Sequence, residues 1–185
     1  MHIDFLKNVF EQNIAKDAIV WNGDSYSYGW LSANIDKQSK LIASCQFKPG
    51  AVVALVGDFS PNSIALLLAL IDQACIVVPL TNANNNIRFF DIAQVEVVFN
   101  VNDDDLVSVD FLSNNGDNHY YEEIRNRSHP GLVLFTSGTS GKPKAAVHDL
   151  LNLLEKFKVR RKALRTLNFL LFDHWGGLNT LFHAI

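Results

Sequence analysis

Cysteine is scarce in this chain of 185 residues, which contains only Cys45 and Cys75. Each lies in an apolar run, and the pair has no Cys-x-x-Cys spacing, so we expect reduced core thiols instead of a disulfide or a zinc site. A surplus of positive charge is also lacking, because the formal net charge is −3. Such a chain has no general attraction to nucleic acid or to an anionic membrane, and we expect no nucleic-acid partner.

Long hydrophobic runs are missing as well. The longest, residues 64–71, is far shorter than the roughly 20 residues that a membrane-spanning helix needs. Residues 1–12 lack the apolar stretch of a signal peptide, so we expect a cytoplasmic protein without a membrane span. Hydrophobic residues make up 48% of the chain and charged residues 19%, which is typical of a globular protein with one core or two small subdomains.

Strands and helices are predicted to alternate along the chain, an order typical of α/β proteins whose largely parallel sheet is flanked by helices. Asn22-Gly23-Asp24 is a hairpin signal between two short strands, and Ser60-Pro61 marks a helix start. The predicted strands are residues 18–21, 25–28, 51–56, 74–80, 95–101, 106–112, 132–135, 145–148 and 167–172. The predicted helices are residues 4–13, 31–45, 62–73, 84–94, 150–165 (with a basic, solvated face) and 177–185. A polar loop at 113–118 and a surface loop edge through 119–123 complete the prediction.

The segment that indicates a function is residues 132–145, LVLFTSGTSGKPKA. Here an apolar strand runs into a loop rich in glycine, hydroxyl groups and lysine. Free backbone N–H groups in such a loop bind anions, and glycines let that backbone come close to a ligand. Hydroxyl donors and ammonium groups add to this, so the segment predicts a polyphosphate site. The hydroxyl donors are Thr136, Ser137, Thr139 and Ser140, and the lysines are Lys142 and Lys144.

Two familiar loops do not fit this segment. A Walker A loop has four residues between its glycines and then Lys with Ser or Thr, whereas only two residues separate Gly138 from Gly141 and Pro143 follows Lys142. A nucleophile elbow reads Gly-x-Ser-x-Gly, but Gly141 follows Ser140 directly. The loop is therefore neither a P-loop nor a hydrolase elbow.

Residues 136–145, TSGTSGKPKA, resemble the phosphate loop of the adenylate-forming ligases, the superfamily of acyl-CoA synthetases, luciferases and peptide-synthetase adenylation domains. The family pattern is Ser/Thr-Ser/Thr-Gly-Ser/Thr-Ser/Thr-Gly-x-Pro-Lys-Gly, and the chain departs from it only at Ala145, which resists backbone conformations open to the usual glycine. Residues 172–177, FDHWGG, are similar to the family's following motif, in which His174 matches an aromatic or His position beside the acyl pocket and thiol tunnel. Residues 28–31 and 52–63 resemble the family's opening part in order and spacing.

This resemblance implies an AMP-forming acid–thiol ligase that uses ATP, Mg²⁺ and, in most members, coenzyme A. A carboxylate would attack the α-phosphate of ATP to give an acyl-adenylate and pyrophosphate, and a thiol of coenzyme A or of a carrier protein would then capture the acyl group. Lys144 and His174 are the implied catalytic residues, and Lys142, at the variable position, is expected to face solvent. The implied phosphate-binding residues are Thr136, Ser137, Gly138, Thr139, Ser140, Gly141 and Lys144. The acyl substrate is a small carboxylic acid whose identity the sequence leaves open.

Residues 177–185 predict the start of an amphipathic helix that lacks a C-cap glycine. We expect residues 1–130 to form a first α/β subdomain, and residues 131–185 to hold the phosphate loop and the start of a second. The expected protein is the N-terminal part of a longer ligase, inactive alone, whose exposed apolar helix face is able to meet a partner. Two alternatives stay open: a stand-alone nucleotide- or phosphate-binding module, and a partner-binding module without ligase chemistry. Residues 103–105 are adjacent carboxylates, interpreted as a solvated turn and not as a metal site.

Overall fold

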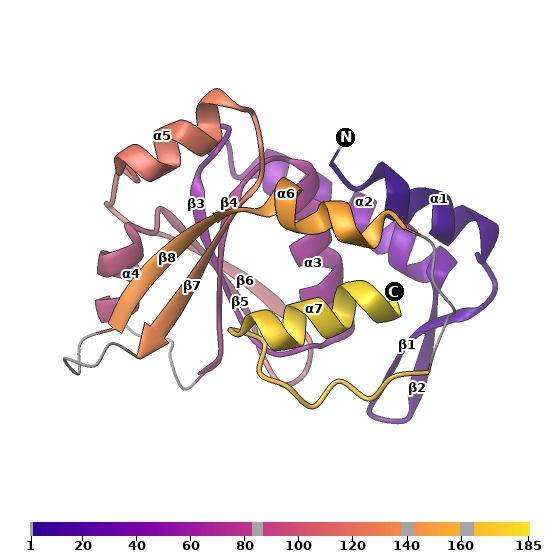
Figure 1. Cartoon of the computed structure of the whole chain (residues 1–185). Coiled ribbons are helices and arrows are strands. Elements are labelled where there is room, and N and C mark those ends of the chain that lie inside the picture. Colours follow the sequence, from indigo (N-terminus) through magenta and orange to yellow (C-terminus); the bar gives the residue numbers. More distant parts are fainter. Residues whose placement is uncertain (1, 83–86, 138–142, 160–164) are drawn as a thin grey trace.

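The fold of the chain is known from a computed structural model that describes residues 2–82, 87–137, 143–159 and 165–185. A six-stranded sheet lies between two layers of helices (Figure 1). Its strands are β3 (Val52–Val56), β4 (Ile76–Leu80), β5 (Val97–Val101), β6 (Val107–Phe111), β7 (Gly131–Ser137) and β8 (Pro143–Asp149). They are ordered β6-β5-β3-β4-β7-β8, with the four inner strands parallel and both edge strands antiparallel. The predicted α/β class with a largely parallel sheet is confirmed.

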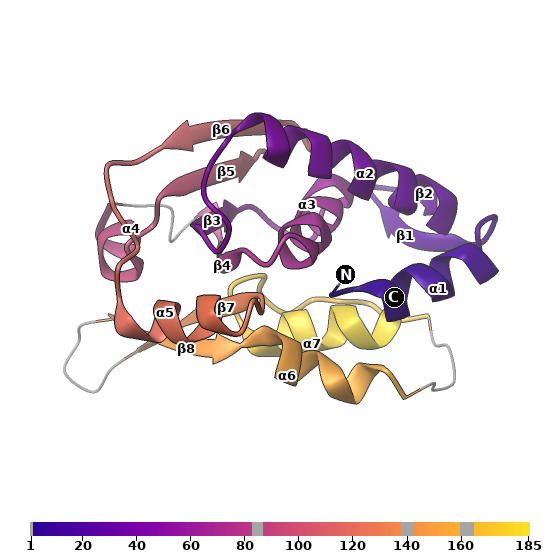
Figure 2. The same ribbon diagram turned by 90° about the horizontal axis from the view of Figure 1, so that it is seen from above.

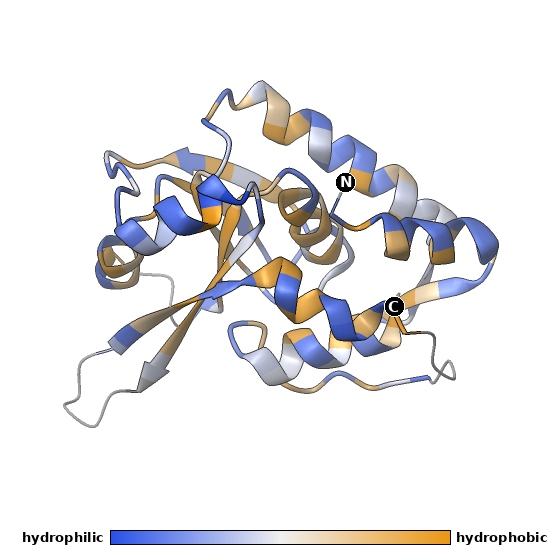
Figure 3. Cartoon of the chain, turned by 45° about the horizontal axis from the view of Figure 1, so that its top comes forward, coloured by the Kyte–Doolittle hydropathy of each residue, from blue (hydrophilic) through white to orange (hydrophobic). Residues whose placement is uncertain are grey.

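Alternating side chains divide the core between the two faces of the sheet. Along β3, Val53 and Leu55 belong to one apolar cluster, whereas Val52, Ala54 and Val56 belong to the other, as the two-residue period of a strand requires. The first cluster is covered by α1 (Asp4–Gln12), α2 (Tyr28–Ser44), α3 (Pro61–Asp72), α6 (Leu150–Leu154) and α7 (Trp175–Ala184), and the second by α4 (Ile87–Ala93) and α5 (His119–Asn126) (Figures 1 and 2). The central helix α3 is buried on nearly all sides and almost uniformly hydrophobic (Figure 3).

Local signals at the predicted hairpin and helix start are confirmed. Strands β1 (Asp17–Trp21) and β2 (Asp24–Ser27) pair antiparallel through Asn22 and Gly23, whose φ angles of 50° and 90° suit the turn that tight hairpins prefer. Ser60 caps α3 by accepting a hydrogen bond from the Ser63 N–H at 3.4 Å, with Pro61 in the first turn.

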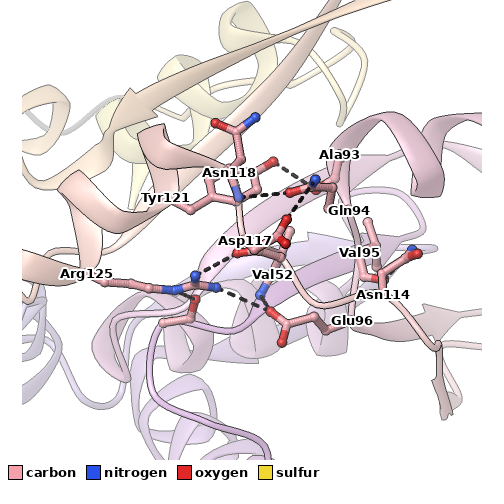
Figure 4. Close-up of polar contacts among 12 residues, drawn as sticks. Val52, Ala93, Gln94, Val95, Glu96, Asn114, Asp117, Asn118, Tyr121 and Arg125 are labelled. Carbon is pink, nitrogen blue, oxygen red and sulfur yellow. Dashed lines mark hydrogen bonds and ion pairs between the residues drawn. The ribbon is translucent and has the colours of Figure 1, made fainter.

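The segment after the loop 113–118 is a helix, so the predicted surface loop at 119–123 is wrong. Asn118 caps α5 by accepting a hydrogen bond from the Tyr120 N–H at 3.0 Å, and Tyr121 and Ile124 form its short buried stripe. The Arg125 side chain fastens the helix to the segments that precede β3 and β5 and to the loop 113–118, donating to the Gly50 and Gly116 carbonyl oxygens at 2.9 and 2.6 Å and to the Glu96 carboxylate at 3.4 Å (Figure 4). Such a short stripe offers little periodicity to read from a sequence.

Of two other predicted elements, one is confirmed only at its start and one is wrong. The basic helix expected at 150–165 ends at Leu154 and continues only as the 3-10 helix η2 (Glu155–Phe157), because the apolar spacing that packs it on the core stops at Phe157. Residues 160–164 lie outside the described residues. The strand expected at 167–172 is irregular chain that pairs with neither sheet edge, and Leu167 and Phe169 are at least 80% exposed.

The helix expected from residue 177 is present, but its apolar side faces inward. Leu178, Leu181 and Phe182 are 1–7% exposed and belong to the larger core cluster, together with β7 residues. The expectation that this face is exposed and meets a partner is therefore wrong, because the core of the same chain covers it. The sheet and this cluster run across residues 130 and 131, and the division into two subdomains there stays a prediction.

Candidate functional site

The predicted phosphate loop lies between two paired strands at one edge of the sheet. Strands β7 and β8 are antiparallel, and Thr136 lies directly opposite Lys144, followed by the last pair, Ser137 with Pro143. Directly opposed residues of an antiparallel pair project from the same face. Both Thr136 and Lys144 are exposed, so a hydroxyl group and an ammonium group share one face at the end of this hairpin.

The middle of the predicted loop lies outside the part of the chain that the structure describes. Gly138, Thr139, Ser140 and Gly141, with Lys142, lie outside the described residues, and Ser137 is described only as the last backbone position of β7. Ala145 pairs with Phe135 inside β8 and is absent from the described non-glycine residues with positive φ. The departure from the family pattern at this position therefore imposes no backbone conformation that alanine resists.

His174 stands at the carboxyl edge of the same sheet. It is the N-cap residue of α7, and the end of α7 that carries it is the end nearer to β7 and β8 (Figures 1 and 2). The neighbouring Asp173 carboxylate accepts a hydrogen bond at 3.3 Å from the hydroxyl of Thr81, which follows directly after β4. Because β4 and β7 are adjacent parallel strands, their carboxyl ends meet at one edge. This brings His174 and the hairpin to the same side of the sheet, on separate elements.

Asp173 and His174 form a close pair with unequal exposure. The His174 Nδ1 atom lies 2.6 Å from the Asp173 Oδ1 atom. The Asp173 side chain is 6% exposed, whereas that of His174 is 60% exposed. A buried carboxylate thus holds one nitrogen of a ring whose other side faces solvent.

Aromatic packing and a glycine hold the turn that precedes His174. Phe172 is fully buried, and its ring meets that of Phe59 edge-on, with centroids 5.0 Å apart. A Cβ atom on Gly177 would lie 2.3 Å from the Leu171 carbonyl oxygen and 3.0 Å from the Phe59 ring, so only glycine fits there. Asp173 and Thr81 were not among the residues predicted for the site, although Asp173 belongs to the segment that carried the resemblance.

A second carboxylate–histidine pair lies at the far end of the hairpin. Asp149 is opposite Gly131 in the β7–β8 register, and its carboxylate lies 2.9 Å from His129 Nδ1 and 3.2 Å from an Arg127 guanidinium nitrogen. Burial alone would raise the pKa of Asp149. Hydrogen bonds from His129, from the Asn152 N–H and from Arg127 outweigh it, and the pKa is lower than its ordinary value. This pair is distant in register from Lys144 and belongs to the cap of α6.

Metal clusters and membrane-spanning helices are both absent from the described residues. Within the described ranges, no three His, Cys, Asp or Glu side chains are grouped so that they could hold a metal ion. No helix in the part of the chain that the structure describes is long and apolar enough to cross a membrane.

Comparisons with known proteins extend these observations. No protein-family model matches the chain. The hybrid PKS-NRPS synthetase fsa1 of Fusarium sp. (strain FN080326) is 27% identical over 76% of this chain, which spans 4% of that protein. The N-terminal subdomain of Klebsiella oxytoca NpsA, solved in complex with 3-hydroxyanthranilyl-AMSN, is similar with a TM-score of 0.58 and 16% identity over 78% of this chain and 39% of that one.

The same Klebsiella protein was also solved within an artificially fused adenylation–PCP di-domain, which matches with a TM-score of 0.58 at 17% identity, over 79% of this chain and 32% of that one. The nonribosomal peptide synthetase FmoA3 (S1046A) matches with a TM-score of 0.69 at 17% identity, over 98% of this chain and 21% of that one. These likenesses show the fold: the chain has the fold of the N-terminal subdomain of adenylation domains, which confirms the resemblance at that level. The chain spans far less than two thirds of the length of each of these proteins.

Proposed function

We propose that this chain is the N-terminal part of an ATP-dependent, carboxylate-activating ligase that forms an acyl-adenylate. The observation that carries the proposal is the β7–β8 register, which sets Lys144 opposite Thr136 where a loop rich in glycine and hydroxyl groups joins the strands. The likeness of the fold to adenylation subdomains supports the same reading.

In the proposed reaction an oxygen of the substrate carboxylate attacks the α-phosphate of ATP. The bond to the β-phosphate breaks, and pyrophosphate leaves with the electron pair and growing negative charge. Prepositioned N–H and hydroxyl donors with a fixed ammonium group stabilise that charge most in the transition state. The residues proposed to hold the β- and γ-phosphates are Thr136, Ser137, Gly138, Thr139, Ser140 and Gly141. Lys144 supplies positive charge to them, and His174 lies beside the acyl group.

The described residues at the hairpin fit a polyphosphate through their donor set, a hydroxyl group and an ammonium group on one face. Mg²⁺ would accompany ATP and neutralise part of its charge. We propose a carrier-protein thiol as the acyl acceptor in place of coenzyme A, since the similar proteins include peptide synthetases and an adenylation domain fused to a carrier protein. The proposed substrate is a small carboxylic acid, and the proposed compartment is the cytoplasm, where ATP is available.

The test replaces Lys144 with alanine in the longer protein that carries this chain and measures carboxylate-dependent ATP–pyrophosphate exchange. We expect Lys144→Ala to lower kcat/KM by roughly 10²- to 10³-fold, the usual effect of removing one charge-stabilising donor. Lys142→Ala, which removes the same charge two residues away, is the matched control and should change the rate little. Equal effects of the two substitutions would contradict the assigned role of Lys144.

The 185-residue chain alone separates the main alternatives. The ligase proposal predicts that the 185-residue chain alone catalyses no ATP–pyrophosphate exchange, because it would be only the N-terminal part of the enzyme. If ATP binds to this chain with an affinity that depends on Lys144, and the longer protein shows no exchange with amino, aryl or fatty acids, a nucleotide-binding module becomes the better explanation.

A further inference from the structure

The contact between the buried Asp173 carboxylate and His174 determines which nitrogen of the histidine ring carries the proton. We propose that Asp173 is a positioning residue that keeps neutral His174 protonated on Nδ1, so that the Nε2 lone pair is presented to a reactant at this edge. The chemical use of that lone pair rests on the proposed function, whereas the tautomer itself does not.

The geometry of the pair sets the position of the proton. The Asp173 carboxylate only accepts hydrogen bonds, so the 2.6 Å contact with Nδ1 requires the proton to be on that nitrogen. Nε2 is on the far side of the ring and then has no proton. An exposed imidazole without a partner prefers the opposite tautomer, with the proton on Nε2. The His174 side chain is 60% exposed, so in water alone it would prefer the Nε2–H tautomer, and the hydrogen bond to Asp173 reverses that preference.

Asp173 is itself held in place. Its second carboxylate oxygen accepts a hydrogen bond from the hydroxyl of Thr81, a residue 92 positions earlier that directly follows β4. The preceding residue, Phe172, is fully buried against Phe59. The carboxylate is therefore fixed at the edge of the sheet, and its hydrogen bond to Nδ1 fixes the orientation of the His174 ring. Positioning by a second residue of this kind makes a histidine an effective hydrogen-bond or proton acceptor.

The test reads the tautomer directly. Long-range ¹H–¹⁵N correlation spectra of the 185-residue chain are recorded at about pH 8.5, well above the ordinary pKa of histidine. We expect the Nδ1–H form of His174 in the unmodified chain and a shift to the Nε2–H form in Asp173→Asn. Asp149→Asn is the matched control, because Asp149 holds His129 through Nδ1 in the same way. That control should change the His129 signal and leave the His174 signal unchanged.

A second variant and an activity readout keep the test decisive. Thr81→Val removes only the hydroxyl that steadies Asp173, and it should give a mixture of the two His174 tautomers even if Asp173→Asn does not fold. In the longer protein, Asp173→Asn should lower kcat by about tenfold to a hundredfold, with KM for ATP and for the acid unchanged. A substitution that only destabilised the fold, without changing the tautomer, would not lower kcat while leaving KM unchanged.

The outcomes separate this proposal from the proposed function. An Nε2–H form of His174 in the unmodified chain overturns the positioning role, whatever the activity. The same holds if active Asp173→Asn enzyme keeps its kcat after the tautomer has changed. Absence of acyl-adenylate formation by the longer protein, together with the expected tautomer, overturns only the ligase proposal.

Discussion

Two adjacent glycines in the first turn of α7 give a sharp test of the packing at the site. A Cβ atom on Gly177 would lie 2.3 Å from the backbone oxygen of Leu171 and 3.0 Å from two atoms of the Phe59 ring. Among the described residues, a Cβ atom on Gly176 would meet only the end of the Leu170 side chain, at 3.2 Å. Leu170 is 41% exposed and able to move, whereas a backbone oxygen and a ring packed on Phe172 are not.

The magnitudes follow from these contacts. Replacing glycine by alanine inside a helix contributes about 0.5–1 kcal/mol of stability when the backbone is compatible. Forcing a backbone shift in a packed region costs about 1–3 kcal/mol or more. We expect Gly177→Ala to lower the free energy of unfolding by about 2 kcal/mol, equivalent to a Tm lower by about 4–8 °C in a chain of this size. Gly176→Ala should leave stability unchanged or raise it by up to about 1 kcal/mol.

Urea unfolding followed by circular dichroism measures both variants against the unmodified chain, with the slope of the transition checked for a change in the unfolded state. Equal stability of Gly177→Ala and Gly176→Ala would refute the reasoning, because it would mean that the turn at Leu171 is not tightly packed against α7.

Two further predictions concern titration and thiol chemistry. The pKa of Asp149 is lower in the folded chain than in the unfolded chain. This carboxylate therefore stabilises the fold at pH values above its unfolded-state pKa, and the stabilisation is lost as the pH falls through its folded-state pKa. Asp149→Asn should therefore lower the free energy of unfolding at pH 6 and flatten its decline as the pH falls below the ordinary aspartate pKa of about 4; an unchanged decline in urea titrations would contradict this. Burial raises the pKa of Cys75 to about 12, and Cys45 is only partly buried. A thiol reagent at about pH 8 should modify Cys45 first and Cys75 only on unfolding, and modification of both at the same rate in the folded chain would oppose the assignment.

Elements with a strong local signal could be predicted from the sequence. Asn22-Gly23 determines its hairpin because both residues tolerate positive φ, and Ser60-Pro61 starts α3 because the hydroxyl group and the fixed ring suit a first helical turn. The buried strands were predictable because they are apolar on both faces, as the parallel core of a sheet requires. Segments whose structure depends on a distant partner were not. Helix α5 has only two buried residues, and residues 167–171 have the composition of a strand but pair with no sheet edge.

The candidate site likewise contains residues that a local motif predicts and residues that only a distant contact brings to it. Thr136 and Lys144 are predicted site residues because a contiguous motif contains them, but their opposition across two strands depends on the register, which a motif does not contain. His174 is a predicted site residue because of a second motif, whereas the roles proposed for Asp173 and Thr81 depend on a contact between residues 92 positions apart. Side-chain contacts across that separation arise from the topology of the sheet, and no local pattern encodes them.

The rest of the carboxyl edge explains why the hairpin, and not the usual crevice of an open α/β sheet, is the better candidate. Ligands of such sheets commonly bind where neighbouring strands continue in opposite directions, here at the ends of β3 and β5. In this chain Asp105, at a φ of 60°, places both carboxylate oxygens 3.0 Å from the Asn62 N–H in the first turn of α3. Gly57 closes the same region, because a Cβ atom there would lie 3.0 Å from the Ser63 hydroxyl and 3.1 Å from the Val101 carbonyl oxygen. The chain's own carboxylate thus takes the positive end of α3, where an anionic ligand would otherwise bind. This favours the proposed phosphate site two strands away, at the β7–β8 hairpin, where Thr136 and Lys144 share one exposed face.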